Sequence, residues 1–410
     1  MVFGSGVVFA LLFLSLYFEV FLLVSFLERR FSTPKMRADA RPESLPDVAI
    51  IVPCFNEERA LGASIESLLA LEYPRGKLSV IVVDDGSTDS TLSIARRYES
   101  DSRVRVFTKE NGGKHTAMNL GLEHTDAELV GCLDADSVVA PDALMQIAPL
   151  FTDARIAAVT PGIHVKTPKT MLQHMQHVEY RLSLFNRFIL AVLGSVFITP
   201  GPFSIFRANV IRELGGWRYA HSTEDMEMAL RLQEAGYMIA NAPNAIVHTA
   251  TPPNLKDLFR QRVRWTYGWL RNAVDYKHMF GNWRYGNLGL IVLPFAIISI
   301  FTGIYFFARI VFYLFVAAYQ KYMELHYAGF HFRPSAPDLF YFNTSAIWML
   351  VWVSVALILV LISIGSLIGT GSRRPPASTP LFVIFYSLLV PLWLGAAVFR
   401  AFFKTGVRWR

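Results

Sequence analysis

The chain has 410 residues, which gives room for one large domain with additional elements. Hydrophobic residues make up 53% of the chain and charged residues only 17%, with a mean hydropathy of +0.36, and this excludes an ordinary soluble protein. The net charge of +7 fits contact with a membrane surface and with anionic substrates. Nucleic-acid binding is a poor fit, because the sequence has no long basic run and no array of stacking aromatic residues.

Long apolar runs predict membrane spans, since a helix needs about 20 mainly apolar residues to cross a bilayer. There are four of them, at residues 2–27, 287–318, 345–369 and 381–399. The alternative for the first run is a secretory signal, but no basic residue precedes it and it is too long. An uncleaved anchor is therefore predicted. Glu19 and Arg309, which interrupt two of the runs, are expected to face a polar bundle interior.

The stretch between the first two runs, residues 28–286, is the part of the sequence that can build a water-soluble domain. Its basic entry, residues 28–41, predicts a cytosolic domain and an outside N-terminus in a multi-pass protein of the plasma membrane. The basic loop 371–379 agrees with this topology. The basic tail 400–410 conflicts with it, because one crossing separates the tail from that loop, and the C-terminal topology stays open.

Strand and helix patterns alternate over residues 48–150, which predicts a mainly parallel α/β sheet covered on both faces. The expected strands are 48–53, 78–84, 103–107 and 128–134, and the expected helices are 56–72, 87–99 and 113–124. Ligands of such sheets bind at the carboxyl ends of the strands, where the polar clusters CFNE, DDGSTD, NGGKH and DADS stand. Cys54 and Cys132, at strand ends, are expected to be reduced core residues.

After residue 150 the pattern is looser. Amphipathic spacing predicts a long helix at 170–190 and a basic helix at 254–274, directly before the membrane. Cap residues and a terminating glycine predict a third helix at 221–236. A Pro-Gly-Pro turn within 199–207 leads into a short strand.

Asp134 and Asp136 follow the last of the four strands and are separated by one alanine. Side chains two positions apart in an extended chain point to the same side, so the two carboxylates can share a cation. Hard divalent ions prefer carboxylate oxygens, and Mg2+ commonly bridges to substrate phosphates. The alternative is a turn that carries two solvated acids, and an isolated Asp-x-Asp does not decide between the two.

Asp84 and Asp85 end another strand and precede a helix. Two carboxylates repel a phosphate at a helix N-terminus, so they suit hydrogen-bond donors such as a nucleobase N–H or ribose hydroxyls. The alternative is that Asp85, Ser87 or Thr88 caps the helix.

Glu224 and Asp225 stand in the expected first turn of the third helix. They either compensate the helix dipole or provide a general base that takes a proton from a hydroxyl nucleophile. On the basic helix, Gln261 and Trp265 share a face because they are four residues apart. Arg264 suits a phosphate leaving group and Trp265 suits stacking on a sugar ring, whereas the alternative is a basic helix that lies on anionic lipid.

The order of these motifs resembles the processive membrane-bound family 2 glycosyltransferases, which include hyaluronan, chitin, cellulose and poly-N-acetylglucosamine synthases. Two acids, the lysine of NGGKH, Asp-x-Asp, TED and QxxRW are followed by membrane helices, and the resemblance covers about residues 46–275. It implies a GT-A fold (Rossmann-like, with a mostly parallel sheet) joined to an α-helical transmembrane region. The implied units are an anchor at 1–28, the GT-A domain at 46–250, interface helices at 251–286 and about three membrane helices at 287–410.

The resemblance also implies a UDP-sugar donor, a Mg2+ or Mn2+ ion, a growing polysaccharide or sugar acceptor, and a lipid bilayer. It assigns Asp225, beside Glu224, as the base and Asp136, with Asp134, to the metal. Lys114 and Asp134 lie along the diphosphate by this assignment. The uridine is assigned to Glu57, Asp84 and Asp85, and the diphosphate and acceptor near the pore mouth to Gln261, Arg264 and Trp265.

The sequence departs from many relatives before the basic helix, where Ala250 and Asn254 replace an acid and a threonine and weaken any inference about the sugar. His248 nearby is either an additional metal ligand or a structural histidine.

The implied activity is processive, inverting polymerisation of sugar into a β-linked polysaccharide that leaves through the membrane helices. The alternatives are a non-processive transferase that adds one sugar to a lipid carrier, a membrane transporter with a nucleotide-sensing domain, and an inactive homologue. QxxRW favours the polymerising enzymes, the helices lack the repeat symmetry of transporters, and the intact acids argue against inactivity.

Overall fold

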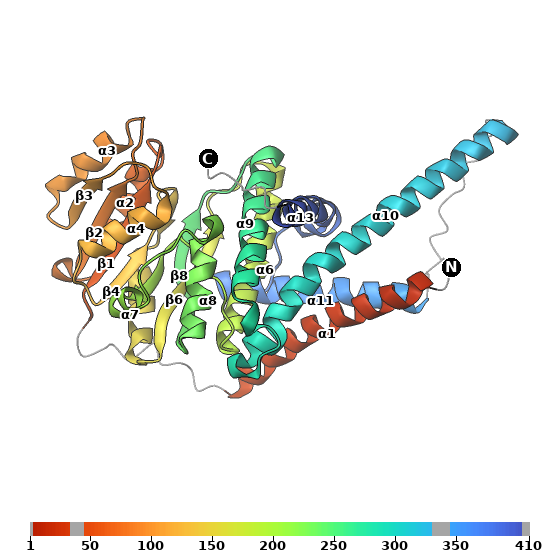
Figure 1. Cartoon of the computed structure of the whole chain (residues 1–410), viewed down its shortest axis with the longest axis horizontal. Helices are drawn as coiled ribbons and strands as arrows, with labels where there is room; N and C mark the ends of the chain where they lie inside the picture. The colour runs from red at the N-terminus through yellow and green to blue at the C-terminus, as the bar shows by residue number, and fades with distance from the viewer. Residues whose placement is uncertain (1–2, 33–44, 330–344, 404–410) are drawn as a thin grey trace.

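The computed structural model describes residues 3–32, 45–329 and 345–403. In these ranges an α/β unit carries long helices that extend from one of its sides (Figure 1). The α/β unit is built on one eight-stranded sheet with the order β3-β2-β1-β4-β7-β6-β8-β5. The strands are β1 (Val48–Cys54), β2 (Leu78–Asp84), β3 (Val104–Thr108), β4 (Leu129–Cys132), β5 (Ser137–Val139), β6 (Ile156–Val165), β7 (Ser204–Arg207) and β8 (Met238–Thr249).

The first half of the sheet is parallel, as predicted, because β3, β2, β1 and β4 all run in the same direction. The second half is mixed. β7 is antiparallel to both β4 and β6, β6 and β8 are parallel to each other, and β5 is antiparallel to β8. Three of these four strands, β5, β6 and β8, are absent from the sequence-based prediction.

Helices cover both faces of the parallel half, which is why its strands are apolar at nearly every position. Alternate residues of β1 point to opposite sides: Ile50 packs with α2 (Leu61–Leu69), and Ile51 packs with α4 (Lys114–Glu123). Gly121 allows the close contact on the α4 side, since a Cβ there would lie 2.7 Å from the Ile51 side chain. The remaining short helices are α3 (Thr91–Arg97), α5 (Ala143–Ile147) and α7 (Ala208–Glu213).

Three longer helices follow the predictions for the second half of the chain. α6 (Met171–Val192) begins with a capping box formed by Thr170 and Gln173, and α9 (Leu255–Asp275) is capped by the Asn254 side chain. α8 (Glu224–Glu234) begins three residues later than predicted. The residues before it, 220–222, have positive φ angles and do not continue the helix.

Four helices in the described ranges are long and apolar enough to cross a membrane, as the four apolar runs predict. They are α1 (Phe3–Ser32), α10 (Leu293–Ala328) with the π-helical turn η7 (Leu288–Val292), α11 (Ala346–Thr370), and the continuous helix α12 (Thr379–Leu381), η8 (Phe382–Tyr386) and α13 (Ser387–Phe402). The basic segment 28–41 and the tail 400–410, which carry the topology prediction, lie mostly outside the described residues.

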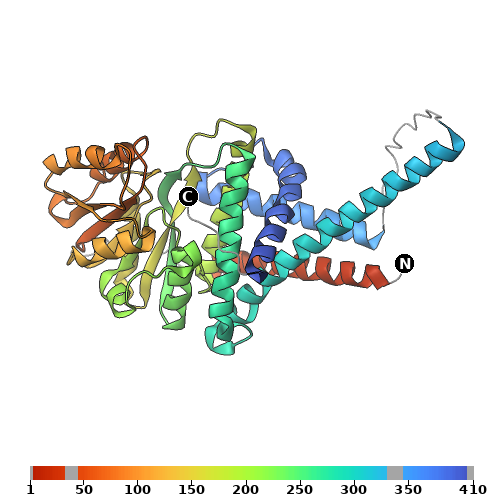
Figure 2. The same cartoon turned by 45° about the horizontal axis from the view of Figure 1, so that its top comes forward.

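The amphipathic helices α6 and α9 lie between the sheet and the apolar helices (Figures 1 and 2). Their apolar side chains pack against the last apolar helix, where Leu172 of α6 and Val263 of α9 join one buried cluster with Tyr386 and Trp393. α6 also packs against α1 and α11 through Phe185 and its neighbours. These two helices therefore connect the α/β unit to the apolar helices.

Candidate functional site

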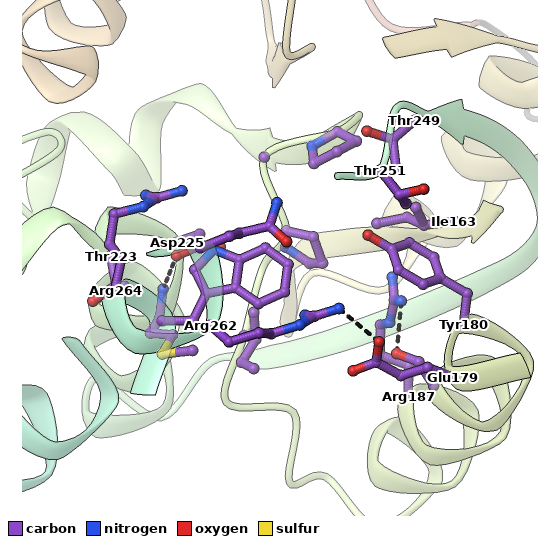
Figure 3. Close-up of a pocket in the computed structure, with 18 of the residues that line it drawn as sticks. Ile163, Glu179, Tyr180, Arg187, Thr223, Asp225, Thr249, Thr251, Arg262 and Arg264 are labelled. Carbon is purple, nitrogen blue, oxygen red and sulfur yellow. Dashed lines mark hydrogen bonds and ion pairs between the residues drawn. The ribbon is translucent and has the colours of Figure 1, made fainter. Parts of the chain in front are cut away.

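A cavity of about 1360 Å³ lies between the sheet edge, the amphipathic helices and the apolar helices. Its walls come from α6 and α9, the start of α8, the loops after β1 and β4, and parts of α1, α10 and α13. Figure 3 shows Asp225 and Arg264 on one side of this pocket and Glu179, Tyr180 and Arg187 on the other. Nine of the eleven predicted site residues line it: Glu57, Lys114, Asp134, Asp136, Glu224, Asp225, Gln261, Arg264 and Trp265. Their roles remain predictions.

Lys114, the first residue of α4, connects two acidic side chains. Its Nζ lies 2.6 Å from Asp134 Oδ1 and 3.5 Å from Glu224 Oε1. Burial by itself lowers the pKa of Lys114, but Asp134, and with it Cys132 and Glu224, raises the pKa well above its usual value. The lysine is therefore a fixed positive charge between the strand end and the first turn of α8.

Asp134 and Asp136 line the same cavity but do not lie on an extended strand. β4 ends at Cys132, and residues 135–136 form a turn, so the prediction that strand geometry puts both carboxylates on one side is wrong. The turn orients Asp136 instead, and the hydroxyl of Ser137 donates to its Oδ1 at 3.2 Å. Within the described residues no group of three or more His, Cys, Asp or Glu side chains is arranged to hold a metal.

Asp84 and Asp85 are buried and are absent from the cavity walls among the described residues. The Asp85 carboxylate accepts hydrogen bonds from Lys109 Nζ at 2.8 Å and from the N–H groups of Gly112 and Gly113 at 3.0 and 2.8 Å. It thereby fixes the loop that leads into Lys114. Asp85 does not cap α3, because the N–H of Thr91 at the start of that helix donates to Asp89 Oδ1. The assignment of Asp84 and Asp85 to the uridine remains a prediction.

Asp225 lies in the first turn of α8, where its Oδ1 accepts from the Met226 N–H at 2.9 Å. Burial raises the pKa of Asp225 to about 6, with a further increase from Glu224, while Lys114 and Arg264 act in the opposite direction. Burial thus outweighs the stabilisation that the helix N-terminus gives to a carboxylate. A carboxylate with this pKa is matched to proton transfer near neutral pH better than an ordinary aspartate.

The QxxRW motif presents three side chains to the cavity from one stretch of α9. Arg264 Nη1 donates to the Ser222 carbonyl at 3.1 Å and so connects α9 to the segment before α8. Gln261 Oε1 is buried and has no hydrogen-bond partner among the described residues. The guanidinium of Arg262 lies 4.4 Å from the centre of the Trp265 ring.

Several polar residues of the cavity wall are missing from the sequence-based prediction. Glu179, Ser183 and Arg187 repeat every four residues along α6, so helical spacing places them on one face. This four-residue spacing of polar residues on an amphipathic helix is the sequence signal that could have identified them. Glu19 of α1, which the sequence predicts to face a polar interior, also lines the cavity, and its Oε2 is buried without a partner in the described ranges.

The other predicted polar residues lie elsewhere. Arg309 hydrogen-bonds to Tyr305 and Tyr313 of its own helix and is absent from the described cavity walls. His248 packs beside His164, with ring centroids 5.8 Å apart, and is absent from the described cavity walls. Of the two departures from many relatives, Ala250 lines the cavity and Asn254 caps α9.

Residues 46–268 match the model of the family described as "Glycosyltransferase like family 2". Among curated proteins, the chain is 29% identical over 307 residues to the poly-beta-1,6-N-acetyl-D-glucosamine synthase of Staphylococcus aureus (strain COL), covering 73% of each chain. It is 27% identical over 267 residues to the enzyme of the same name from Staphylococcus epidermidis, covering 64% of each chain.

Among solved structures, a mannosyltransferase from Pyrobaculum calidifontis in complex with GDP-Man and Mn2+ is similar at a TM-score of 0.57 and 19% identity. The likeness covers 96% of this chain and 99% of that one. It therefore includes the apolar helices as well as the α/β unit, and it confirms the predicted GT-A fold with its helical region.

Proposed function

The chain belongs to glycosyltransferase family 2, and from that premise we propose that it is a processive, inverting polysaccharide synthase. It takes sugar from a UDP-sugar, adds it to a growing β-linked chain and passes the product through its own membrane helices. The observation that carries this proposal is the single cavity that joins the carboxylates of the α/β unit to three apolar helices. Its volume of about 1360 Å³ exceeds the range of about 300–1,000 Å³ usual for one small ligand.

The cavity wall combines two kinds of element, as this function needs. Lys114, Asp134 and Asp225 belong to the α/β unit, whereas Glu19 of α1 and Ser299 of α10 belong to helices long and apolar enough to cross a membrane. A polar chain extended beside these carboxylates lies in the same cavity as the apolar helices. We propose that these helices form its route across the bilayer, with the α/β unit in the cytosol.

The cavity wall carries positive charge suited to a diphosphate. Lys114 is held as a cation between Asp134 and Glu224, and the guanidinium of Arg264 lines the same cavity. Both offset negative charge that develops on a nucleoside diphosphate as the sugar leaves. The staphylococcal relatives carry poly-beta-1,6-N-acetyl-D-glucosamine synthase in their names, so we propose UDP-N-acetylglucosamine as the first donor to test.

The residues present fit a divalent cation held partly by the substrate. Asp134 and Asp136 line the cavity with hard carboxylate oxygens, and one or two such carboxylates together with substrate phosphates are the usual ligands by which proteins would hold Mg2+. We propose that these two residues hold Mg2+ or Mn2+, as the Pyrobaculum neighbour was solved with Mn2+. When bound, the ion neutralises charge on the leaving diphosphate.

Asp225 acts as the general base in this proposal. Its carboxylate lines the cavity, and its raised pKa of about 6 leaves it mostly ionised at neutral pH and still basic enough to accept a proton from an acceptor hydroxyl. The hydroxyl oxygen attacks the anomeric carbon as the bond to the diphosphate breaks. One displacement inverts the configuration, so an α-linked donor gives a β-linked product. Trp265 stacks on the acceptor sugar.

The test is to incubate membranes that contain the protein with each radiolabelled UDP-sugar and Mg2+ or Mn2+, and to size the product. A long polymer that starts from UDP-N-acetylglucosamine is the expected result. A single sugar on a lipid-extractable carrier contradicts the polymerase and supports the non-processive transferase. No transfer from any UDP-sugar contradicts the donor class.

A further inference from the structure

Three residues that lie far apart in the sequence meet at the cavity wall: Glu179 of α6 and Arg262 of α9, which line it, and Tyr386 at the end of η8. Arg262 Nη2 lies 2.6 Å from Glu179 Oε2 and 3.4 Å from Tyr386 Oη. The Tyr386 hydroxyl donates to the same Glu179 oxygen at 2.8 Å. Each residue thus contacts the other two, and the contacts connect both amphipathic helices to the last apolar helix.

Two members of this cluster are buried and the third is partly exposed. The Arg262 side chain is 8% exposed, Glu179 is 29% exposed, and Tyr386 is among the largest fully buried side chains. Burial lowers the pKa of Arg262, but the Glu179 carboxylate outweighs this effect and raises it. The guanidinium is therefore charged, and its direction is set by two partners rather than by solvent.

The flat face of the Arg262 guanidinium contacts Trp265 of the QxxRW motif. Its guanidinium carbon lies 4.4 Å from the centre of the Trp265 ring, within the distance of a cation–π contact. A guanidinium is planar, so hydrogen bonds made along its edge fix the orientation of its face. Glu179 and Tyr386 hold the edge, and the face lies against the indole.

We propose that Glu179, Arg262 and Tyr386 are positioning residues that set the indole of Trp265 for the acceptor sugar. The proposal rests on the proposed function, in which Trp265 stacks on the acceptor. Because Tyr386 belongs to a helix able to span the membrane, the indole is held relative to the apolar helices as well as to the α/β unit. The π-helical turn that ends at Tyr386 is a feature often found at functional positions.

Tyr386→Phe tests this with little change of shape, because it removes the hydroxyl and keeps the ring that packs against Trp393. One hydrogen bond contributes about 0.5–1.5 kcal/mol, so we expect the mean product length to fall roughly two- to tenfold with UDP-N-acetylglucosamine as donor. Donor affinity, measured by titration in the same detergent, is expected to stay at the wild-type value. Tyr319→Phe is the matched control, since this tyrosine is 56% exposed on α10 and its variant is expected to make product of normal length.

A double-mutant cycle with Trp265→Ala identifies the route of the effect. If the cluster acts through the indole, Tyr386→Phe has no further effect on product length once Trp265 is alanine. Normal product from Tyr386→Phe, or an additive loss in the double variant, overturns the positioning role. Glu179→Gln keeps a hydrogen-bond acceptor for Arg262, and it is expected to retain more product length than Glu179→Ala; equal losses contradict the proposal.

The cycle also separates this inference from the proposed function. A Trp265→Ala variant that makes polymer of normal length overturns the acceptor role of Trp265 and the positioning role with it. A Trp265→Ala variant with short product, together with a normal Tyr386→Phe variant, overturns the positioning role alone. Wild-type protein that makes no polymer overturns both.

Discussion

Lys114 Nζ lies 2.6 Å from Asp134 Oδ1, and the backbone of Gly201 packs directly against this ion pair. A Cβ at Gly201 would lie 2.7 Å from Asp134 Oδ1 and would also contact Lys114 Nζ. The Pro-Gly-Pro turn that the sequence places before a short strand therefore has a second consequence. It brings a residue without a side chain to the point where α4 and the end of β4 meet.

Gly201→Ala tests the importance of this close contact between Gly201 and the ion pair. The added methyl group must displace the Lys114 ammonium or the Asp134 carboxylate, so we expect weaker UDP-sugar binding and a loss of transfer of at least tenfold. Gly76→Ala is the matched control, because a Cβ at Gly76 meets no atom within 4 Å. Donor affinity by titration and transfer rate with membranes check the result. Equal activity of the two variants contradicts a tight requirement at Gly201.

Asp225 gives the proposed activity a defined pH dependence. Because burial and Glu224 raise its pKa to about 6, the base is ionised above that pH and becomes protonated as the pH falls through it. We expect kcat/KM to fall on the acid side with a midpoint near pH 6. Asp225→Asn is expected to lose about 10²–10⁴-fold in rate and to bind the UDP-sugar as the wild-type protein does. Normal turnover of Asp225→Asn contradicts the general-base role and leaves Asp225 only as a charge at the helix N-terminus.

The metal proposal predicts that Asp136→Asn abolishes transfer. The substitution keeps the size of the side chain and removes a carboxylate oxygen from the cavity wall, so folding and membrane insertion are expected to be normal. Asp126→Asn is the control, since Asp126 is an exposed acid away from the cavity. Activity is measured with Mg2+, with Mn2+ and in EDTA. Full activity in EDTA, or an active Asp136→Asn variant, contradicts metal use at this site.

The proposed orientation in the membrane is tested at Arg97, an exposed residue at the end of α3. Arg97→Cys is expected to resist an impermeant thiol reagent in intact cells and to react after permeabilisation, because the α/β unit faces the cytosol in this proposal. The native thiols give a low background, since Cys54 and Cys132 are both buried. Efficient labelling of Arg97→Cys in intact cells contradicts the proposed topology and places the α/β unit outside the cell.

Much of the fold can be predicted from local patterns. β1 and β2 are buried on both faces, and their unbroken apolar runs give their positions to within a residue. The four membrane-length helices follow from the length of their apolar segments. In contrast, β8 carries the mixed sequence MIANAPNAIVHT, which gives no local strand pattern, and it forms a strand by pairing with β6 and β5. The proposed domain boundaries at 46, 250 and 286 remain predictions.

The candidate site, like the fold, could be predicted from the sequence only in part. The residue types and their order in the chain were enough to identify the acids, the lysine and QxxRW as candidate site residues. Short motifs carry these groups, and the chemistry of a sugar nucleotide needs them. The tertiary structure alone decided that Asp85 anchors the loop before Lys114, that burial raises the pKa of Asp225, and that Tyr386 reaches Glu179 across 207 positions of the chain. Burial and contacts at that separation depend on how the helices pack, and no local pattern in the sequence encodes them.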